Sequence, residues 1–161
     1  MSWMPEARRA TPADARALVE LRVAMLSSFF DEVPGGEWRE MCRAMFEERL
    51  ADESGDFAAF VVDGPAGVPV SSGVGWVQQH LPSPRNQHGR RGHIASMSTL
   101  PEHRGHGCAT AILSAMLAWM ESLGVTRVEL RASVMGEPVY RALGFEVTAE
   151  PTLVWTAPRR P

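Results

Sequence analysis

Apolar residues recur at three- and four-residue steps from Ala109 to Leu123, which is the period of an α-helix and not that of a strand. This stripe predicts a long amphipathic helix with one buried face. The stripe consists of Ile112, Leu113, Met116, Leu117, Met120 and Leu123. Any fold of this chain therefore has to cover that face.

The segment before this helix predicts a strand over 93–100, a turn at Pro101 and a loop that contains Gly105 and Gly107. Proline cannot donate a backbone hydrogen bond and ends the strand, while the glycines let the backbone approach a ligand closely. The first N–H groups of the helix have no internal partner and lie at the positive end of its dipole. The helix start therefore predicts an anion site, usually for phosphate, and a flexible turn is the alternative.

The loop carries neither the Gly-x-x-x-x-Gly-Lys-Ser/Thr pattern of nucleoside triphosphate sites nor the Gly-x-Gly-x-x-Gly pattern of dinucleotide sites. Its run 104–109 instead fits Gln/Arg-x-x-Gly-x-Gly/Ala, and the run 97–101 before it reads Met-x-Thr-x-Pro. Together they resemble the coenzyme A motif of the GNAT superfamily of acyl-coenzyme A N-acyltransferases. A second run, Tyr-x-x-Leu-Gly-Phe at 140–145, resembles the closing motif of the same superfamily, in the same order and at the usual separation.

The resemblance implies an α/β fold in which a central mixed, mostly antiparallel sheet is flanked by helices and splays between the strands 93–100 and 126–132. It implies one domain over 1–161 and an N-acetyltransferase that moves an acetyl group from acetyl-coenzyme A to a primary amine by direct attack. The acceptor, a small molecule or a peptide, is not identified by the sequence. A non-catalytic acyl-coenzyme A sensor or interaction module is the alternative, and an unrelated phosphate-binding fold would leave the 140–145 motif unexplained.

The resemblance also places the co-substrate. Its pyrophosphate would lie on backbone N–H groups of the loop, and its pantetheine arm would pair with the 97–99 backbone like an added strand. In the family the N–H at the Met97 position also polarises the thioester carbonyl. Ser133 stands where many relatives have Asn, so its contact with the pantetheine is an open question. The residues assigned to the co-substrate are Met97, Ser98, Thr99, Arg104, Gly105, His106, Gly107, Cys108, Ala109 and Ser133.

Direct attack needs a neutral amine, and an alkylamine is about three pKa units short of that at neutral pH, which costs roughly 4 kcal/mol. A base or a water chain must remove this proton. His93 is the candidate base because it precedes Met97 on the same strand and imidazole titrates in the right range. Glu129 and Glu32 are the runners-up, and a structural histidine is the alternative. Tyr140 is the candidate acid for the leaving thiolate, or a ring that only packs on the co-substrate.

The acceptor side is the least defined part of the sequence. The resemblance puts it around the end of the first predicted helix, where we assign Phe29, Phe30 and Glu32, together with Trp76 on a strand. Core packing is the alternative for these apolar residues. A polar loop at 81–92 carries Arg85, Arg90 and Arg91, which would select an anionic acceptor if they do not simply face solvent.

Composition limits the partners. The formal charge of −3 gives no electrostatic reason to expect nucleic acid. No apolar run is long enough to span a membrane and the start lacks a signal peptide core, so we expect a cytoplasmic protein. The two cysteines and five histidines show no metal-binding spacing, so no metal is assigned. Trp38 and Trp155 are candidates for a homodimer contact.

Periodicity and turn residues predict the remaining elements. A short strand at 8–10 leads into a helix capped by Thr11, and a second helix covers 38–50. Strands are expected at 57–62 and 70–79, paired antiparallel, and a further strand at 125–132 follows the main helix. A short helix at 136–143 and closing strands at 145–147 and 153–155 complete the chain.

Overall fold

The computed structural model describes residues 2–159. Contacts divide the chain into two compact units, one that ends at Arg131 and one that begins at Ala132, and each is described by itself. The expectation of a single domain over 1–161 stays a prediction.

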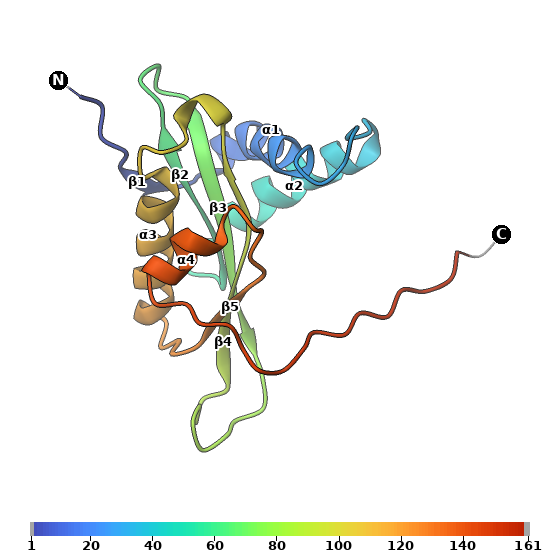
Figure 1. Ribbon diagram of the computed structural model, residues 1–161, viewed down its shortest axis with the longest axis vertical. Helices are drawn as coiled ribbons and strands as arrows, with labels where there is room; N and C mark the ends of the chain where they lie inside the picture. Colours follow the sequence, from blue (N-terminus) through green and yellow to red (C-terminus); the bar gives the residue numbers. More distant parts are fainter. Residues whose placement is uncertain (1, 160–161) are drawn as a thin grey trace. The chain divides into compact units, whose positions relative to one another are not determined.

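The first unit is built on a five-stranded sheet with strand order β1-β2-β3-β4-β5 (Figure 1). The first four strands pair antiparallel with their neighbours, while β4 and β5 run parallel. This confirms the predicted mixed, mostly antiparallel sheet. The strands are β1 (Ala7–Arg9), β2 (Phe57–Asp63), β3 (Pro69–Gln79), β4 (Arg90–Thr99) and β5 (Val128–Leu130).

Helices cover both faces of this sheet. One face is covered by α3 (Cys108–Ser122), the helix predicted from the apolar stripe, whose Ile112, Met116 and Met120 are fully buried. The other face packs against α1 (Ala15–Leu26), and α2 (Glu37–Leu50) packs against α1 and β2.

Gly73 and Gly75 on β3 lie under α3, because a Cβ atom on Gly75 would lie 2.9 Å from the Met120 Cε. The residue between them, Val74, belongs to the opposite core with Leu18 and Phe46 from α1 and α2. Trp76 continues that second face and packs against the edge of the same core. Odd positions of β3 therefore face α3, and even positions face α1 and α2.

A β-bulge interrupts β4 at its centre. Ser72 is opposite Ser98, but Val74 is opposite Ala95, so β4 carries one extra residue at this point. Ser96 takes up the extra length with φ 53°, the only non-glycine residue with positive φ in the described chain. Pairing of β4 with β5 ends at Ile94 and Leu130, whereas β4 continues to Thr99. This is the predicted opening of the sheet.

Several predicted boundaries were wrong by a few residues. The loop placed at 81–92 is shorter, because β4 begins at Arg90, where its backbone pairs with Gln79. The strand placed at 125–132 is confined to Val128–Leu130, since only this part meets β4. The helix capped by Thr11 opens with a 3-10 turn at Pro12–Asp14, and Phe29 lies beyond its end at Leu26.

The second unit contains α4 (Glu137–Ala142), close to the helix predicted at 136–143. The strands predicted at 145–147 and 153–155 are absent from the described residues of this unit. Their apolar residues favour an extended chain, but a ladder needs a partner strand, and the described residues of this unit supply none. Leu153 and Trp155 are accordingly exposed, at 89% and 82%.

Candidate active site

A loop with two left-handed glycines leads into α3. Gly105 has φ +75° and Gly107 has φ +87°, conformations that L side chains rarely adopt. A Cβ atom on Gly105 would meet nothing within 4 Å, and one on Gly107 would meet only the Pro5 ring at 3.8 Å. The space above both glycines is therefore open to a ligand.

The backbone N–H groups of this loop and of the first turn of α3 are free to bind a ligand. The first backbone bond of the helix runs from the Ala111 N–H to the Gly107 carbonyl at 3.0 Å, and no backbone acceptor among residues 2–159 takes the N–H groups from Gly105 to Thr110. These donors and the positive end of the α3 dipole form an anion cradle. The Arg104 side chain donates to the Thr99 carbonyl at 3.1 Å, which ties the loop to the end of β4.

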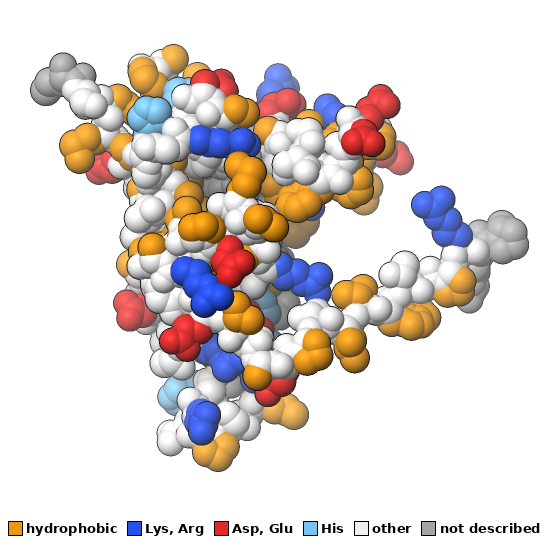
Figure 2. All heavy atoms as spheres, viewed as in Figure 1, with side chains coloured by type: hydrophobic (Ala, Val, Ile, Leu, Met, Phe, Trp, Pro, Cys, Tyr) orange, Lys and Arg blue, Asp and Glu red, His pale blue; other side chains and the backbone are white. Residues whose placement is uncertain are grey.

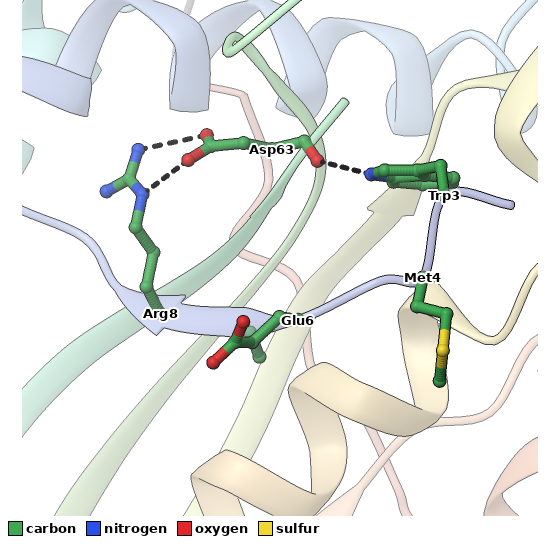
Figure 3. A pocket seen from close by; sticks show the side chains of 6 residues that line it. Trp3, Met4, Glu6, Arg8 and Asp63 are labelled. Carbon is green, nitrogen blue, oxygen red and sulfur yellow. Dashed lines mark hydrogen bonds and ion pairs between the residues drawn. The ribbon is translucent and has the colours of Figure 1, made fainter. Parts of the chain in front are cut away.

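The N-terminal segment supports the same loop. The Trp3 indole donates to the Asp63 carbonyl at 3.2 Å and lies against the rings of His103 and His106, at centroid distances of 5.6 and 5.9 Å. Figure 3 shows Trp3 beside Asp63, whose carboxylate pairs with Arg8 at 2.7 Å. The open cavity of about 280 Å³ in this view is lined by N-terminal residues and contains none of the predicted site residues.

The free edge of β4 runs from Ala95 to Thr99, where no strand of the first unit pairs on the β5 side. It contains Met97, Ser98 and Thr99. The Met97 side chain turns toward α3, because a Cβ atom on Gly73 would lie 2.5 Å from its sulfur. The backbone of this stretch is therefore positioned between the bulge at Ser96 and the cradle at Gly105–Gly107, as a strand-like ligand would require.

His93 lies on β4, two residues before this free edge begins at Ala95, and on the sheet face that packs against α1. It is opposite Trp76 on β3 and Glu129 on β5. Its Nε2 is buried and has no hydrogen-bond partner among the described residues. Burial lowers the pKa of His93 and the His80 and Arg91 charges act in the same direction, while the Glu129 carboxylate opposes them. The imidazole is thereby kept neutral, as a base must be.

Two arginines hold Glu129. Arg127 donates to its carboxylate at 3.0 Å, and Arg91 lies 3.9 Å away. The Arg127 hydrogen bond lowers the pKa of Glu129 below its usual value. Glu129 is therefore a poor proton acceptor, and of the two side chains His93 is the better base.

Tyr140 and Ser133 belong to the second unit. The Tyr140 ring packs edge-on against Phe145 with centroids 6.0 Å apart, and burial raises the pKa of its phenol. A raised pKa keeps the phenol protonated, the state that a general acid needs. The Ser133 hydroxyl accepts the Gly136 N–H at 3.1 Å, so it caps the turn before α4.

The structure brings Trp76 and His93 together but leaves the other acceptor-side candidates in solvent. Phe29 and Phe30 are 61% and 58% exposed in the connection between α1 and α2, and Glu32 is exposed beside them. In Figure 2, hydrophobic side chains gather on the underside of the α1–α2 pair. The exposed hydrophobic residues of α2 include Met41 and Met45. No described hydrogen bond or aromatic contact joins this segment to His93.

Three residues of the site were missed by sequence reasoning. Ser96 forms the bulge, Arg22 on α1 donates to the Ser96 hydroxyl at 3.2 Å, and Gly73 makes room for Met97. A glycine inside a strand pattern is a recognised signal of a bulge or a close approach, so Gly73 was the available clue. Neither Ser96 nor Arg22 belongs to a sequence pattern that marks such a site.

These features agree with the comparisons with known proteins. The chain belongs to the acetyltransferase (GNAT) family, which its sequence matches over residues 19–145. No protein of curated function matches the sequence.

Solved structures share the fold. A predicted acetyltransferase from Clostridium acetobutylicum, crystallised with acetyl-coenzyme A, has a TM-score of 0.80 and 25% identity over 94% of this chain and 96% of that one. A GCN5-related N-acetyltransferase from Ralstonia eutropha JMP134 has a TM-score of 0.76 and 23% identity over 94% and 98% of the two chains. Glucosamine-6-phosphate N-acetyltransferase from Arabidopsis thaliana has a TM-score of 0.75 and 20% identity over 96% and 100%.

The protein is therefore an acyl-coenzyme A-dependent acyltransferase with acetyl-coenzyme A as its co-substrate. The cradle fits this molecule, because its free N–H groups and the open space above Gly105 and Gly107 suit a pyrophosphate. Among the residues that the structure describes, no three of His, Cys, Asp and Glu are grouped as metal ligands. None of the described helices is long and apolar enough to cross a membrane.

Proposed function

We propose that this protein is an N-acetyltransferase that acetylates a primary amine by direct attack, with His93 as the general base. The observation that supports the proposal is the buried His93 Nε2, which has no hydrogen-bond partner within residues 2–159 and lies on β4, four residues before Met97. A buried nitrogen without a partner is costly unless a ligand or a water supplies one. An ammonium or amine group is a suitable partner.

The chain supplies groups for three parts of the reaction. The acetyl donor is bound as a thioester that presents its carbonyl to the amine, and the Met97 N–H polarises that carbonyl. His93 takes the proton that the acceptor ammonium must lose before its nitrogen can form the new N–C bond, and releases that proton to solvent. Tyr140 gives a proton to the sulfur as the C–S bond breaks, and the second proton that the nitrogen loses on becoming an amide restores the phenol, so proton and charge are balanced over the cycle. The assignments of Met97 and Tyr140 rest on the family resemblance.

The co-substrate is held mainly by backbone. In this proposal its pyrophosphate takes the N–H groups from Gly105 to Ala109, and its pantetheine arm pairs with the free edge at Met97 and Thr99. Backbone recognition tolerates side-chain changes, which explains how His106 and Cys108 can stand in a phosphate loop. The His106 Nδ1 lies 2.9 Å from the Arg104 carbonyl, so this side chain shapes the loop from within.

The proposal is tested by calorimetric titration with acetyl-coenzyme A, followed by thiol release with a panel of primary amines. We expect micromolar binding and release of coenzyme A with at least one amine class. Binding without release from any amine would favour a non-catalytic acyl-coenzyme A sensor instead. If acetyl-coenzyme A does not bind, the loop before α3 only caps the helix.

Tyr140→Phe isolates the acid role, because Tyr140 is the only tyrosine of the chain. Removing one hydroxyl should lower kcat at least tenfold and leave the Kd for acetyl-coenzyme A within a few-fold. The matched control is Phe145→Leu, which disturbs the ring that packs against Tyr140 and keeps the phenol. Unchanged turnover in Tyr140→Phe would remove Tyr140 from the acid role.

A further inference from the structure

Helix α1 crosses β4 at one buried contact. The Ser98 hydroxyl donates to the Leu21 carbonyl at 2.7 Å, and both residues are buried. Arg22, the next residue of the helix, donates to the Ser96 hydroxyl at 3.2 Å. Because Ser96 lies between Ser98 and His93 along β4, the guanidinium is placed on the His93 side of the crossing.

This guanidinium has most of its donors free. The Ser96 hydroxyl is its one described side-chain partner, and no carboxylate among residues 2–159 lies within ion-pair distance of it. An arginine carries five N–H donors in a planar fork. Arg22 is partly exposed, and none of its nitrogens is among the buried side-chain atoms that lack a hydrogen-bond partner. The free donors of this guanidinium are therefore accessible to a ligand, and no described carboxylate neutralises its charge.

A second helix borders the same place. The Arg22 charge acts on the thiol of Cys42 on α2, where it opposes the burial that raises the Cys42 pKa. The guanidinium of Arg22, which is on α1, thus lies near both α2 and the bulge of β4. Its position is fixed by the hydrogen bond to Ser96 and by the hydrogen bond from Ser98 to Leu21, the residue before Arg22 on α1. The guanidinium is therefore preorganised for a ligand.

The arginines near the loop after β3 do not offer an equivalent charge. Arg91 faces the carboxylate of Glu129 at 3.9 Å, and Arg127 shares that carboxylate at 3.0 Å. Arg90 donates to the Leu123 carbonyl at 2.6 Å at the end of α3. Of the three loop arginines expected to select an anionic acceptor, Arg90 and Arg91 are therefore already engaged, and Arg85 is exposed in the β3–β4 connection. Arg22, which sequence reasoning did not single out, is the arginine that lies beside the bulge of β4.

We propose that Arg22 binds a carboxylate or phosphate group of the acceptor, so that the substrate is a primary amine carrying an anion close to the reacting nitrogen. This inference rests on the proposed function. Planar anions with two oxygens match the arginine fork. Ser96 is three residues from His93, which limits their Cα separation to about 10 Å at 3.3 Å per residue, so one small acceptor can place its amine at His93 and its anion at Arg22.

The test compares acceptors that differ only in charge. The panel consists of α-amino acids, each paired with its amide, and aminoalkyl phosphates, each paired with its amino alcohol. For the wild-type protein and for Arg22→Met, kcat/KM is measured with every pair by thiol release. We expect Arg22→Met to lower kcat/KM at least tenfold for the preferred anionic class and at most twofold for its neutral partner, mainly through KM.

The control is Arg16→Met, the same substitution on the exposed side of the same helix, which should leave every ratio unchanged. Acetyl-coenzyme A affinity and the unfolding midpoint show that each variant is folded. Equal losses on anionic and neutral members of a pair in Arg22→Met, or a preference for neutral acceptors in the wild type, would overturn the inference. The class of acceptor whose kcat/KM falls in Arg22→Met shows whether the bound anion is a carboxylate or a phosphate.

A binding measurement separates this inference from the proposed function. Protein saturated with coenzyme A is titrated calorimetrically with the same anionic amines, so that the phosphate cradle is filled. Binding to the wild type that Arg22→Met weakens at least tenfold supports the anion site even if no thiol is released. Absence of release from every amine overturns the proposed function alone, whereas equal binding by both proteins, or by neither, overturns the Arg22 site.

Discussion

The imidazole of His93 stacks on the indole of Trp76, with ring centroids 6.0 Å apart and an angle of 18° between the planes. The two residues are paired in register across β3 and β4, so the strand ladder itself fixes the stack. His80 lies on His93 at 6.0 Å as well, with 30° between the rings. The His93 imidazole thus contacts two aromatic rings, and neither ring provides a hydrogen bond to its buried Nε2.

The first prediction concerns the pH dependence of the reaction. Because burial lowers the pKa of His93 below its ordinary value of 6.5, the neutral base persists to lower pH. We expect the acidic limb of kcat/KM to fall with an apparent pKa below 6.5. His93→Gln should lose this limb and lower kcat/KM about 100-fold or more, as expected for a lost general base.

His88→Gln is the matched control, because His88 is exposed in the β3–β4 connection. It should keep both the rate and the acidic limb. A His93→Gln variant that retains the wild-type profile would assign the base elsewhere, to Glu129 or to a water.

The second prediction concerns the Glu129 carboxylate beside His93, the proposed base. Glu129 favours the protonated form of His93 and so raises its pKa against the effect of burial. Glu129→Gln removes that charge, and the His93 pKa should fall further. The acidic limb of kcat/KM should then move to lower pH, while a rate set by Glu129 as the base would collapse at all pH values.

Glu137→Gln provides the comparison for this variant, since Glu137 pairs with Arg141 on the surface of α4. It should leave the limb in place. A shift of the limb to higher pH in Glu129→Gln would contradict the assigned sign of the interaction.

The sequence predicted the parts of this fold whose residues carry local signals. The α3 stripe, the antiparallel pair of β2 and β3, and the glycines at Gly105 and Gly107 all have short-range patterns, and the structure contains each of them. The predicted strands at 145–147 and 153–155 were wrong because apolar residues show only that a segment suits a sheet. A strand also needs a partner, which the residues of the segment itself do not reveal.

The site was predictable to a lesser extent because its geometry depends on register. Trp76 and His93 meet because β3 and β4 keep one register from Gln79 opposite Arg90 to Val74 opposite Ala95. The bulge at Ser96 shifts the pairing only beyond that point, and a serine gives no hint of a positive φ. Arg22 reaches Ser96 from a distance of 74 residues in the chain, through the packing of α1 on β4. Such long-range contacts follow from the fold and not from any spacing in the sequence.

The third prediction tests the bulge. A Cβ atom on Gly73 would lie 2.5 Å from the Met97 sulfur and 2.8 Å from both the Ile112 Cγ2 and the Met116 Cε. Gly73→Ala should therefore lower the free energy of unfolding by about 1–3 kcal/mol through overpacking. It should also reduce kcat, because relief of the clash moves the Met97 backbone. Urea unfolding and thiol release measure the two effects.

Gly35→Ala is its control, since a Cβ atom there would meet nothing within 4 Å and the residue has no positive φ. Its free energy of unfolding should change by no more than a few tenths of a kcal/mol, about the scale of a neutral surface substitution. A Gly73→Ala variant as stable and as active as Gly35→Ala would show that Met97 repacks without disturbing the edge.

The fourth prediction separates backbone strain from ligand exclusion at the cradle. Gly107→Val places a branched side chain at φ +87° in the open space before α3, where the pyrophosphate of acetyl-coenzyme A is proposed to lie. Gly67→Val places the same side chain at φ +73° in the β2–β3 turn, with nothing within 4 Å and no assigned role in binding. Both variants should lose a similar stability, about 1–2 kcal/mol, because the left-handed conformation is unfavourable for valine. Only Gly107→Val should weaken acetyl-coenzyme A binding, by at least tenfold in a calorimetric titration of folded protein. Equal affinities of the two variants would place the pyrophosphate away from the start of α3.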